Sequence, residues 1–180
     1  MSVVPNVIVD ITPQQQQQLI MGLIPCQNRY FQDLVWPIIR PGVVELASAS
    51  EGEWTEFRAW REVYAGSFQL YICYLNKSAE PLKEGINQEA FVNKLKTPAD
   101  GYAGFFALQL QDVGVHIFCA YIAPEYRKTN VASMALEFLE QQVKAMGAPY
   151  ISGCAIPELL EAAKKRGYVP TVMNFRKKLK

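Results

Sequence analysis

IAPEYRKTNVASMALEFLEQ, residues 122–141, carries the strongest structural signal in this chain. The apolar run Val115 to Ile122, which leads into it, is typical of a strand. From Val131 onward, apolar residues recur at the spacing of one helical face, which predicts a long amphipathic helix ended by Gly147. A strand that passes through a short turn into a helix presents unpaired amide groups at the helix start, where a phosphate can bind.

The residues around this stretch extend the pattern on both sides. Tyr102 to Leu110 is rich in aromatic and aliphatic residues, and with Val115 to Ile122 it predicts a hairpin across the turn Gln111 to Gly114. The apolar face of the long helix consists of Val131, Met134, Ala135, Phe138, Leu139, Val143 and Met146. Four later elements are predicted: a strand at Tyr150 to Cys154, a helix from Pro157 to Gly167, and strands at Tyr168 to Val172 and Met173 to Leu179.

The N-terminal half gives weaker patterns. Val7 to Ile11 predicts a short strand. Thr12 is a good N-cap and Pro13 suits a first helical turn, so Gln14 to Gln18 is interpreted as the exposed start of a helix. That helix is expected to continue through Leu19, Ile20 and Leu23.

Four aromatic residues predict a second helix, from Gly52 to Ala65. They are Trp54, Phe57, Trp60 and Tyr64, and their helical spacing is interpreted as a core-facing stripe, with a substrate-facing wall as the alternative. Gly66 is expected to end the helix. A strand at Phe68 to Leu75 and a short helix at Gln88 to Leu95 follow.

The composition limits the class of protein. The chain has 180 residues, a mass of 20.3 kDa, 50% hydrophobic and 19% charged residues and a formal net charge of +1. These values exclude a disordered chain and argue against a protein dedicated to nucleic acid through phosphate contacts. The length suits one domain. The order of strands and helices predicts an α/β (α+β) fold with a mixed sheet.

The segment from residue 122 resembles motif A of the GNAT superfamily of N-acetyltransferases. In that motif a strand is followed by Gln or Arg, two residues, Gly, one residue, and Gly or Ala; Arg127 and Ala132 match the first and last positions. Residues 100–180 resemble the family's central hairpin and closing section, whereas residues 24–66 match no part of it and are expected to be a helical elaboration. The resemblance implies one GNAT-like domain over residues 1–180, with a mixed, mostly antiparallel sheet flanked by helices.

The resemblance also implies a cofactor site. Acetyl-CoA would be the co-substrate, with its pyrophosphate on the backbone amides of the turn and its pantetheine arm along the preceding strand. The implied binding residues are Tyr121, Ile122, Arg127, Lys128, Thr129, Asn130, Val131 and Ala132. The implied reaction is transfer of an acetyl group to a primary amine of an unidentified acceptor.

Three positions depart from the family pattern. Asn130 stands where Gly is usual, and it is expected to adopt the left-handed conformation that Asn tolerates better than most residues. Ala163 stands where many members carry the Tyr that reprotonates the CoA thiolate, and Ile156 where many carry Asn. The usual acid is therefore missing, and Tyr121 is a candidate to replace it.

His116 is the candidate general base. In the histone-acetylating branch of the family a Glu lies eleven residues before the first motif position, and counting back from Arg127 gives His116. A neutral imidazole can take a proton from the attacking amine. The alternative is a hydrogen-bonded histidine on a half-buried strand. Cys119 on the same strand lacks a second histidine to activate it as a nucleophile.

The remaining features bear on environment and partners. One histidine and four cysteines without a CxxC pair make a metal site improbable, and the cysteines are interpreted as reduced and buried in a cytoplasmic protein without a membrane segment. Residues 161–180 hold seven basic side chains against one acidic, a net +6. This basic end favours one alternative to amine acetylation, a GNAT-fold protein that modifies or binds nucleic acid. The departures at Asn130, Ala163 and Ile156 favour another, a non-catalytic module that binds a partner through residues 24–66.

Overall fold

The structure, a computed structural model, describes residues 7–9, 19–26, 28–50, 54–76, 87–96, 101–127, 129–153 and 164–169, with side chains from residue 24 on except Asn76. The elements in chain order are β1 (Val7–Val9), β2 (Leu19–Pro25), α1 (Arg29–Ala49), α2 (Glu56–Tyr64), β3 (Gln69–Asn76), α3 (Gln88–Leu95), β4 (Tyr102–Gln111), β5 (Gly114–Ile122), the short 3-10 helix Pro124–Tyr126, α4 (Val131–Ala145) and β6 (Ile151–Gly153).

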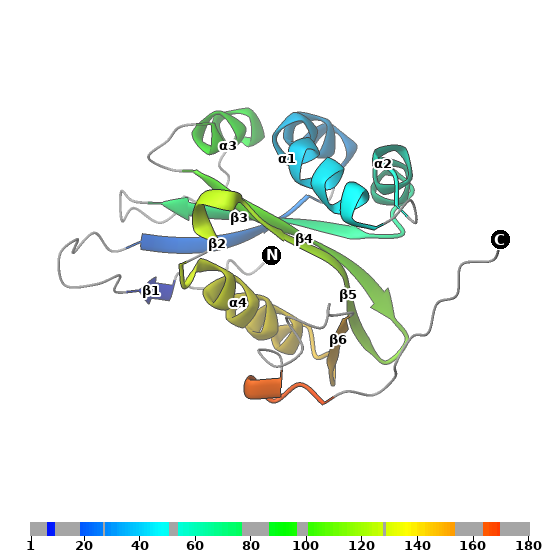
Figure 1. Cartoon of the computed structure of the whole chain (residues 1–180), viewed down its shortest axis with the longest axis vertical. Coiled ribbons are helices and arrows are strands. Elements are labelled where there is room, and N and C mark those ends of the chain that lie inside the picture. The colour runs from blue at the N-terminus through cyan, green and yellow to red at the C-terminus, as the bar shows by residue number, and fades with distance from the viewer. Residues whose placement is uncertain are drawn as a thin grey trace.

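The described strands form one sheet in the order β1-β2-β3-β4-β5-β6. Every neighbouring pair is antiparallel except β5 and β6, which run parallel. Helices α1, α2 and α3 cover one face of the sheet and α4 covers the other (Figure 1). The predicted mixed, mostly antiparallel sheet flanked by helices is confirmed.

Each face of the sheet has its own core. On the side of the three helices, fully buried residues of α1 such as Val35 and Ile39 meet Ile72 of β3 and Phe105 of β4. On the other side, α4 buries the apolar face that its sequence predicts, at Val131, Ala135, Phe138, Leu139 and Val143. Met146 lies beyond the end of α4 and is 51% exposed, so it does not belong to that face. Gly147, with φ of +77°, ends the helix as expected.

The second half of the sheet follows the sequence closely. The hairpin of β4 and β5 pairs Gln111 with Gly114 across the predicted turn, and β6 lies within the predicted Tyr150 to Cys154 strand. Helix α3 has the predicted bounds. Tyr168 and Val169 are described and lie outside any strand, so the predicted strand does not begin at Tyr168.

The helix expected through Leu19, Ile20 and Leu23 is wrong. These residues lie in β2, which pairs with β1 on one side and β3 on the other. A short apolar run is compatible with both a helix and a strand. Here the hydrogen-bonded pairing with β1 and β3 stabilises the strand. The Gln14 to Gln18 segment lies outside the described residues.

Residues 24–66 contain two helices. Asn28 caps α1 by accepting a hydrogen bond from the amide of Phe31 at 2.8 Å. The helix contains Pro37 and Pro41, residues that normally interrupt a helix because they lack an amide donor. Packing of its buried face on the sheet maintains the helix across both prolines.

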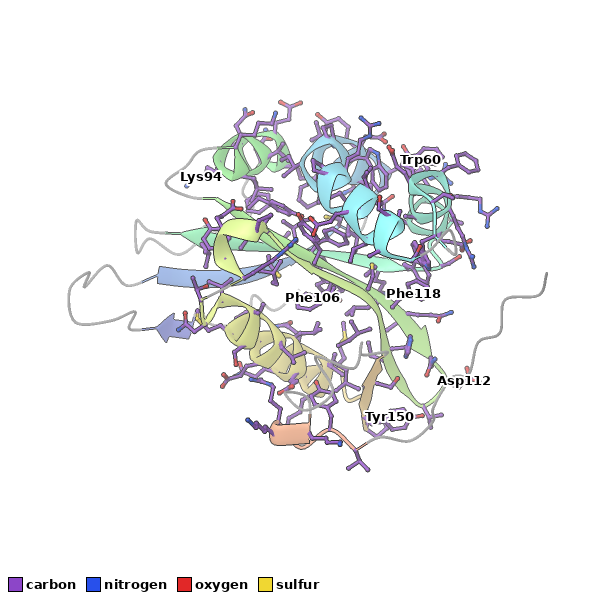
Figure 2. The ribbon with its side chains drawn as sticks, viewed as in Figure 1. Trp60, Lys94, Phe106, Asp112, Phe118 and Tyr150 are labelled. Carbon is purple, nitrogen blue, oxygen red and sulfur yellow. The ribbon has the colours of Figure 1, made fainter. Side chains whose placement is uncertain are left out.

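The expectation of a core-facing aromatic stripe on α2 is wrong in part. Thr55 caps this helix, which therefore begins at Glu56 rather than at Gly52. The residues buried against the sheet are the small Ala59 and Val63. Phe57 is 68% exposed, and it forms a stacked series with Trp60 and Tyr64. Figure 2 shows Trp60 at the outer side of the helix layer.

The described residues contain neither a helix that could cross a membrane nor a cluster that could hold a metal ion. None of the described helices is long and apolar enough to cross a membrane. In the same part of the chain, no group of three or more His, Cys, Asp or Glu side chains is arranged to hold a metal ion.

Candidate functional site

Strand β5 continues beyond its parallel neighbour. The pairing of β5 with β6 stops at Ile117 and Gly153, whereas β5 runs on to Ile122. At about 3.3 Å per residue, this leaves roughly 16 Å of strand edge without a partner among the described residues. We call this side of residues 118–122 the open edge.

The backbone groups that face the open edge follow from the antiparallel ladder. The amide of Ala123 donates to the carbonyl of Ala103 in β4 at 2.9 Å, so residue 123 points toward β4. Because successive residues of a strand point their backbone groups to opposite edges, those of Ile122 and Ala120 point away from β4. No described strand pairs with these groups, and the Ile122 carbonyl accepts its hydrogen bond from the side chain of Arg127.

A β-bulge interrupts β5 at the start of the open edge. Ala107 pairs with Cys119 and Leu108 pairs with Ile117, so Phe118 is an extra residue without a partner. Phe118 and Cys119 consequently both pack against the core on the side of α1 and α2. The bulge breaks the regular ladder where the parallel pairing ends.

The open edge leads directly to the start of α4. Thr129 closes the turn: its hydroxyl donates to the carbonyl of Tyr126 at 2.7 Å and accepts from the amide of Val131 at 3.2 Å. Ala132 and Ser133 in the first turn are exposed, as are Thr129 and Asn130. The positive end of the helix dipole therefore faces solvent beside the open edge.

The conformation expected of Asn130 is wrong. Its φ of −76° and ψ of −2° are right-handed, so the turn requires no left-handed residue at this position. Asn therefore replaces the usual glycine without backbone strain. Lys128 lies outside the described residues.

Arg127 joins three parts of the site. Its Nη2 lies 2.7 Å from Oε1 of Glu45 in α1, and its Nε donates to the carbonyl of Ile122 at 2.9 Å. The guanidinium lies 5.2 Å from the ring centroid of Tyr121. The side chain thus covers the end of the open edge while remaining 43% exposed.

Tyr121 lies beneath α1. Its hydroxyl donates to Oε2 of Glu45 at 3.0 Å, and its ring lies against Gly42, where a Cβ atom would come within 2.6 Å of two ring carbons. Burial is the main cause that raises the pKa of the Tyr121 phenol, and the hydrogen bond to Glu45 adds to it. The phenol is therefore protonated at neutral pH.

His116 lies two residues before the bulge and pairs across the sheet with Ser152 of β6. Its Nδ1 is 3.0 Å from the Ser152 hydroxyl oxygen. Its ring meets Phe118 edge-on, with the centroids 6.4 Å apart. Nε2 makes no hydrogen bond to any described residue, so this nitrogen is available to a ligand on the side of α1 and α2.

The cysteines that the structure describes are unpaired. Cys26, Cys73 and Cys119 are free thiols, and Cys154 lies outside the described residues. Burial raises the pKa of Cys119 to about 12, which keeps it a thiol at neutral pH and argues against a nucleophilic role.

Several residues of this site escaped the sequence analysis. Glu45, Gly42 and Ser152 belong to segments far from the motif, and no local pattern marks them. Conversely, Ile156, Ala163 and most of the basic C-terminal segment lie outside the described residues. Within that segment, Arg166 is described: its Nη1 donates to the hydroxyl of Ser133 at 2.6 Å, at the start of α4.

No family model matches the sequence, and no curated protein matches it. Solved structures do match. An aminoglycoside acetyltransferase, meta-AAC0020, from an uncultured soil metagenomic sample is 10% identical, covering 89% of this chain and 97% of its own, with a TM-score of 0.52. The putative acetyltransferase YycN from Bacillus subtilis is 16% identical, covering 88% and 98%, with a TM-score of 0.52. A GCN5-related N-acetyltransferase from Ralstonia eutropha JMP134 is 13% identical, covering 87% and 97%, with a TM-score of 0.53.

These likenesses identify the architecture. The protein has an acetyltransferase fold. Within that class it has the fold of the GCN5-related N-acetyltransferases (GNAT), in a divergent form. The three structures match 87–89% of this chain, so the matched region includes part of residues 24–66. The sequence alone does not relate those residues to the family.

Proposed function

We propose that the protein transfers an acetyl group from acetyl-CoA to a primary amine. The observation that carries this proposal is the open edge of β5, which runs from a bulge to the exposed start of α4 within a GNAT fold. An extended amide chain with a phosphate at one end matches such a site, because strand edges bind amides and helix starts bind phosphates.

The cofactor would be held by the backbone and by two cationic residues, Lys128 and Arg127. The outward-facing groups of Ile122 and Ala120 pair with the amides of the pantetheine arm, beside the ring of Tyr121. The exposed turn from Thr129 to Ala132, together with Lys128, binds the pyrophosphate. Arg127 contributes its charge to the phosphates and releases the carbonyl of Ile122 as it does so.

His116 is the proposed base. We assign its Nδ1 proton to the hydrogen bond with Ser152, which leaves Nε2 free to accept a proton from the ammonium or the attacking amine. The amine nitrogen then forms the new bond to the acetyl carbon, and the carbon–sulfur bond breaks. A backbone amide at the Phe118 bulge stabilises the negative charge that develops on the acetyl oxygen.

Tyr121 is the proposed acid. Its raised pKa keeps the proton on the phenol, so the group can donate to the CoA thiolate that leaves. The hydroxyl makes its hydrogen bond to Glu45 when no ligand is present. A shift of Arg127 toward the phosphates frees Glu45 to move, and the phenol can then turn toward the sulfur.

We extend the proposal to a single domain working in the cytoplasm. The described cysteines are free thiols, as expected in a reducing compartment.

The test is transfer of isotope-labelled acetyl from acetyl-CoA to a panel of amines, including sisomicin, the compound named for one structural neighbour. We expect enzyme-dependent label in at least one amine, and a loss of at least about a hundredfold for His116→Gln. Label that stays in acetyl-CoA or appears only as acetate, with every amine, would overturn the proposal.

A further inference from the structure

Three aromatic rings form a cluster beside His116 on the side of α1 and α2. The ring centroid of Phe118 lies 4.4 Å from that of Trp54 and 4.4 Å from that of Phe68. Trp54 and Phe68 are themselves stacked, with centroids 5.9 Å apart. We call these three residues the aromatic wall.

The aromatic wall is assembled from three separate elements. Trp54 precedes the cap of α2, and its amide donates to the Ser50 hydroxyl at 2.9 Å. Phe118 is the bulge residue of β5, and Figure 2 shows it at the sheet beneath the helices. Phe68 is buried, with 7% exposed, whereas Trp54 and Phe118 are half-buried. The wall therefore has a buried base and two rings that reach the surface.

The wall is adjacent to the proposed chemistry. Phe118 contacts the edge of the His116 ring on one side and begins the open edge on the other. If the amine nitrogen of the acceptor lies between His116 and a thioester bound at the bulge, the rest of the acceptor lies on or near the aromatic wall. Aromatic faces stack well with other flat apolar groups.

The guanidinium of Arg58 also lies beside the wall, 5.8 Å from the ring centroid of Trp54, within the range of a cation–π contact.

We propose that the acceptor is an amine carried on an aromatic or similarly flat apolar group, and that Trp54 and Phe118 bind this group. This inference rests on the proposed function, since it names the acceptor class for the same site. It assigns acceptor specificity to two residues that do not take part in proton transfer.

The test compares three amines in the labelled transfer assay: phenethylamine, butylamine and sisomicin. Stacking and burial of a phenyl ring predict kcat/KM about tenfold higher for phenethylamine than for butylamine. Sisomicin, which carries no aromatic ring, is expected to be a poorer acceptor than phenethylamine. Acetyl-CoA affinity serves as a common control.

Two variants locate the preference. Trp54→Leu should lower the ratio of kcat/KM for phenethylamine to kcat/KM for butylamine about five- to tenfold. Trp60→Leu is the matched control, because Trp60 stacks with Phe57 and Tyr64 on the outer side of α2, away from the wall. It should leave both values unchanged. Circular dichroism checks that each variant is folded.

The possible results separate the acceptor inference from the proposed function. Equal use of phenethylamine and butylamine, or a preference for sisomicin, overturns the inference while the proposed function stands. If no amine is acetylated, binding of phenethylamine to the CoA-loaded protein is measured by equilibrium dialysis. Binding that Trp54→Leu abolishes supports the aromatic site although the transfer proposal fails, and absence of binding overturns both.

Discussion

Arg127 and Glu45 form an ion pair of 2.7 Å that ties the turn before α4 to the last turns of α1. Glu45 also accepts the hydrogen bond of Tyr121, and Arg127 also binds the Ile122 carbonyl. One contact therefore links a helix of the N-terminal half to the proposed cofactor edge, and a ligand that takes Arg127 must change the contacts of α1.

The ion pair should contribute little to the stability of the free protein. Arg127 and Glu45 are 43% and 49% exposed, and exposed ion pairs contribute about 0–1 kcal/mol. We expect Glu45→Gln to lower the free energy of unfolding by less than about 1 kcal/mol, because the amide oxygen still accepts from Tyr121. Urea denaturation measures this. A loss several times larger would mean that the pair is a structural anchor of α1 rather than an exchangeable contact.

His116 and Ser152 should act as a unit in catalysis. The Ser152 hydroxyl oxygen lies 3.0 Å from Nδ1 of His116 and holds the orientation of the ring. We expect Ser152→Ala to lower kcat about tenfold with little change in the KM for acetyl-CoA, because the imidazole loses its oriented hydrogen bond. Ser152→Thr keeps the hydroxyl and should restore kcat. An unchanged kcat in Ser152→Ala would contradict a positioning role for Ser152.

Gly42 should resist substitution despite its place in a helix. At an open helical position, Gly to Ala stabilises by about 1 kcal/mol. Here the new Cβ would lie 2.6 Å from the Tyr121 ring, so we expect Gly42→Ala to destabilise by about 1–3 kcal/mol. Combining it with Tyr121→Leu should recover most of that loss in a double-mutant cycle. Stabilisation by Gly42→Ala alone would show that α1 does not close on Tyr121 in solution.

The buried cysteines predict sensitivity to alkaline pH. Burial raises the pKa of Cys119 to about 12, and it also raises those of Cys26 and Cys73. The folded state therefore holds protons that the unfolded chain releases near pH 8.5. The stabilising contribution is complete below that pH and is lost as the pH rises toward 12.

Chemical denaturation at a series of pH values checks this prediction. The free energy of unfolding should fall above about pH 8.5, and Cys119→Ala should make the fall less steep. A stability that is flat up to pH 11 in the wild-type protein would contradict the burial of these thiols.

The parts of the fold that were predicted are those with a local signal. The 3.6-residue period of α4 and the two apolar runs around the 111–114 turn are each sufficient to define an element. Strand β2 was assigned to a helix because its short apolar run is ambiguous until β1 and β3 pair with it. Helix α1 is hidden in the sequence by Pro37 and Pro41, and its position depends on a buried face that packs on the sheet.

The same division applies to the candidate site. Arg127 and the start of α4 were found because they follow one another in a recognisable order. Glu45 and Ser152 were missed because their partners, Tyr121 and His116, are 76 and 36 residues away. The aromatic residue Trp54 was noticed, but its spacing alone could not distinguish a core position from a wall beside His116.

Calorimetric titration of acetyl-CoA tests the central claim most directly, using the wild-type protein, Arg127→Ala and Glu45→Gln. We predict micromolar binding to the wild type, a loss of at least about tenfold in Arg127→Ala, and equal or tighter binding in Glu45→Gln, which frees Arg127 for the phosphates. The absence of binding to folded wild-type protein would contradict the account. So would equal affinities of the wild type and Arg127→Ala, since the cofactor would then not use the turn before α4.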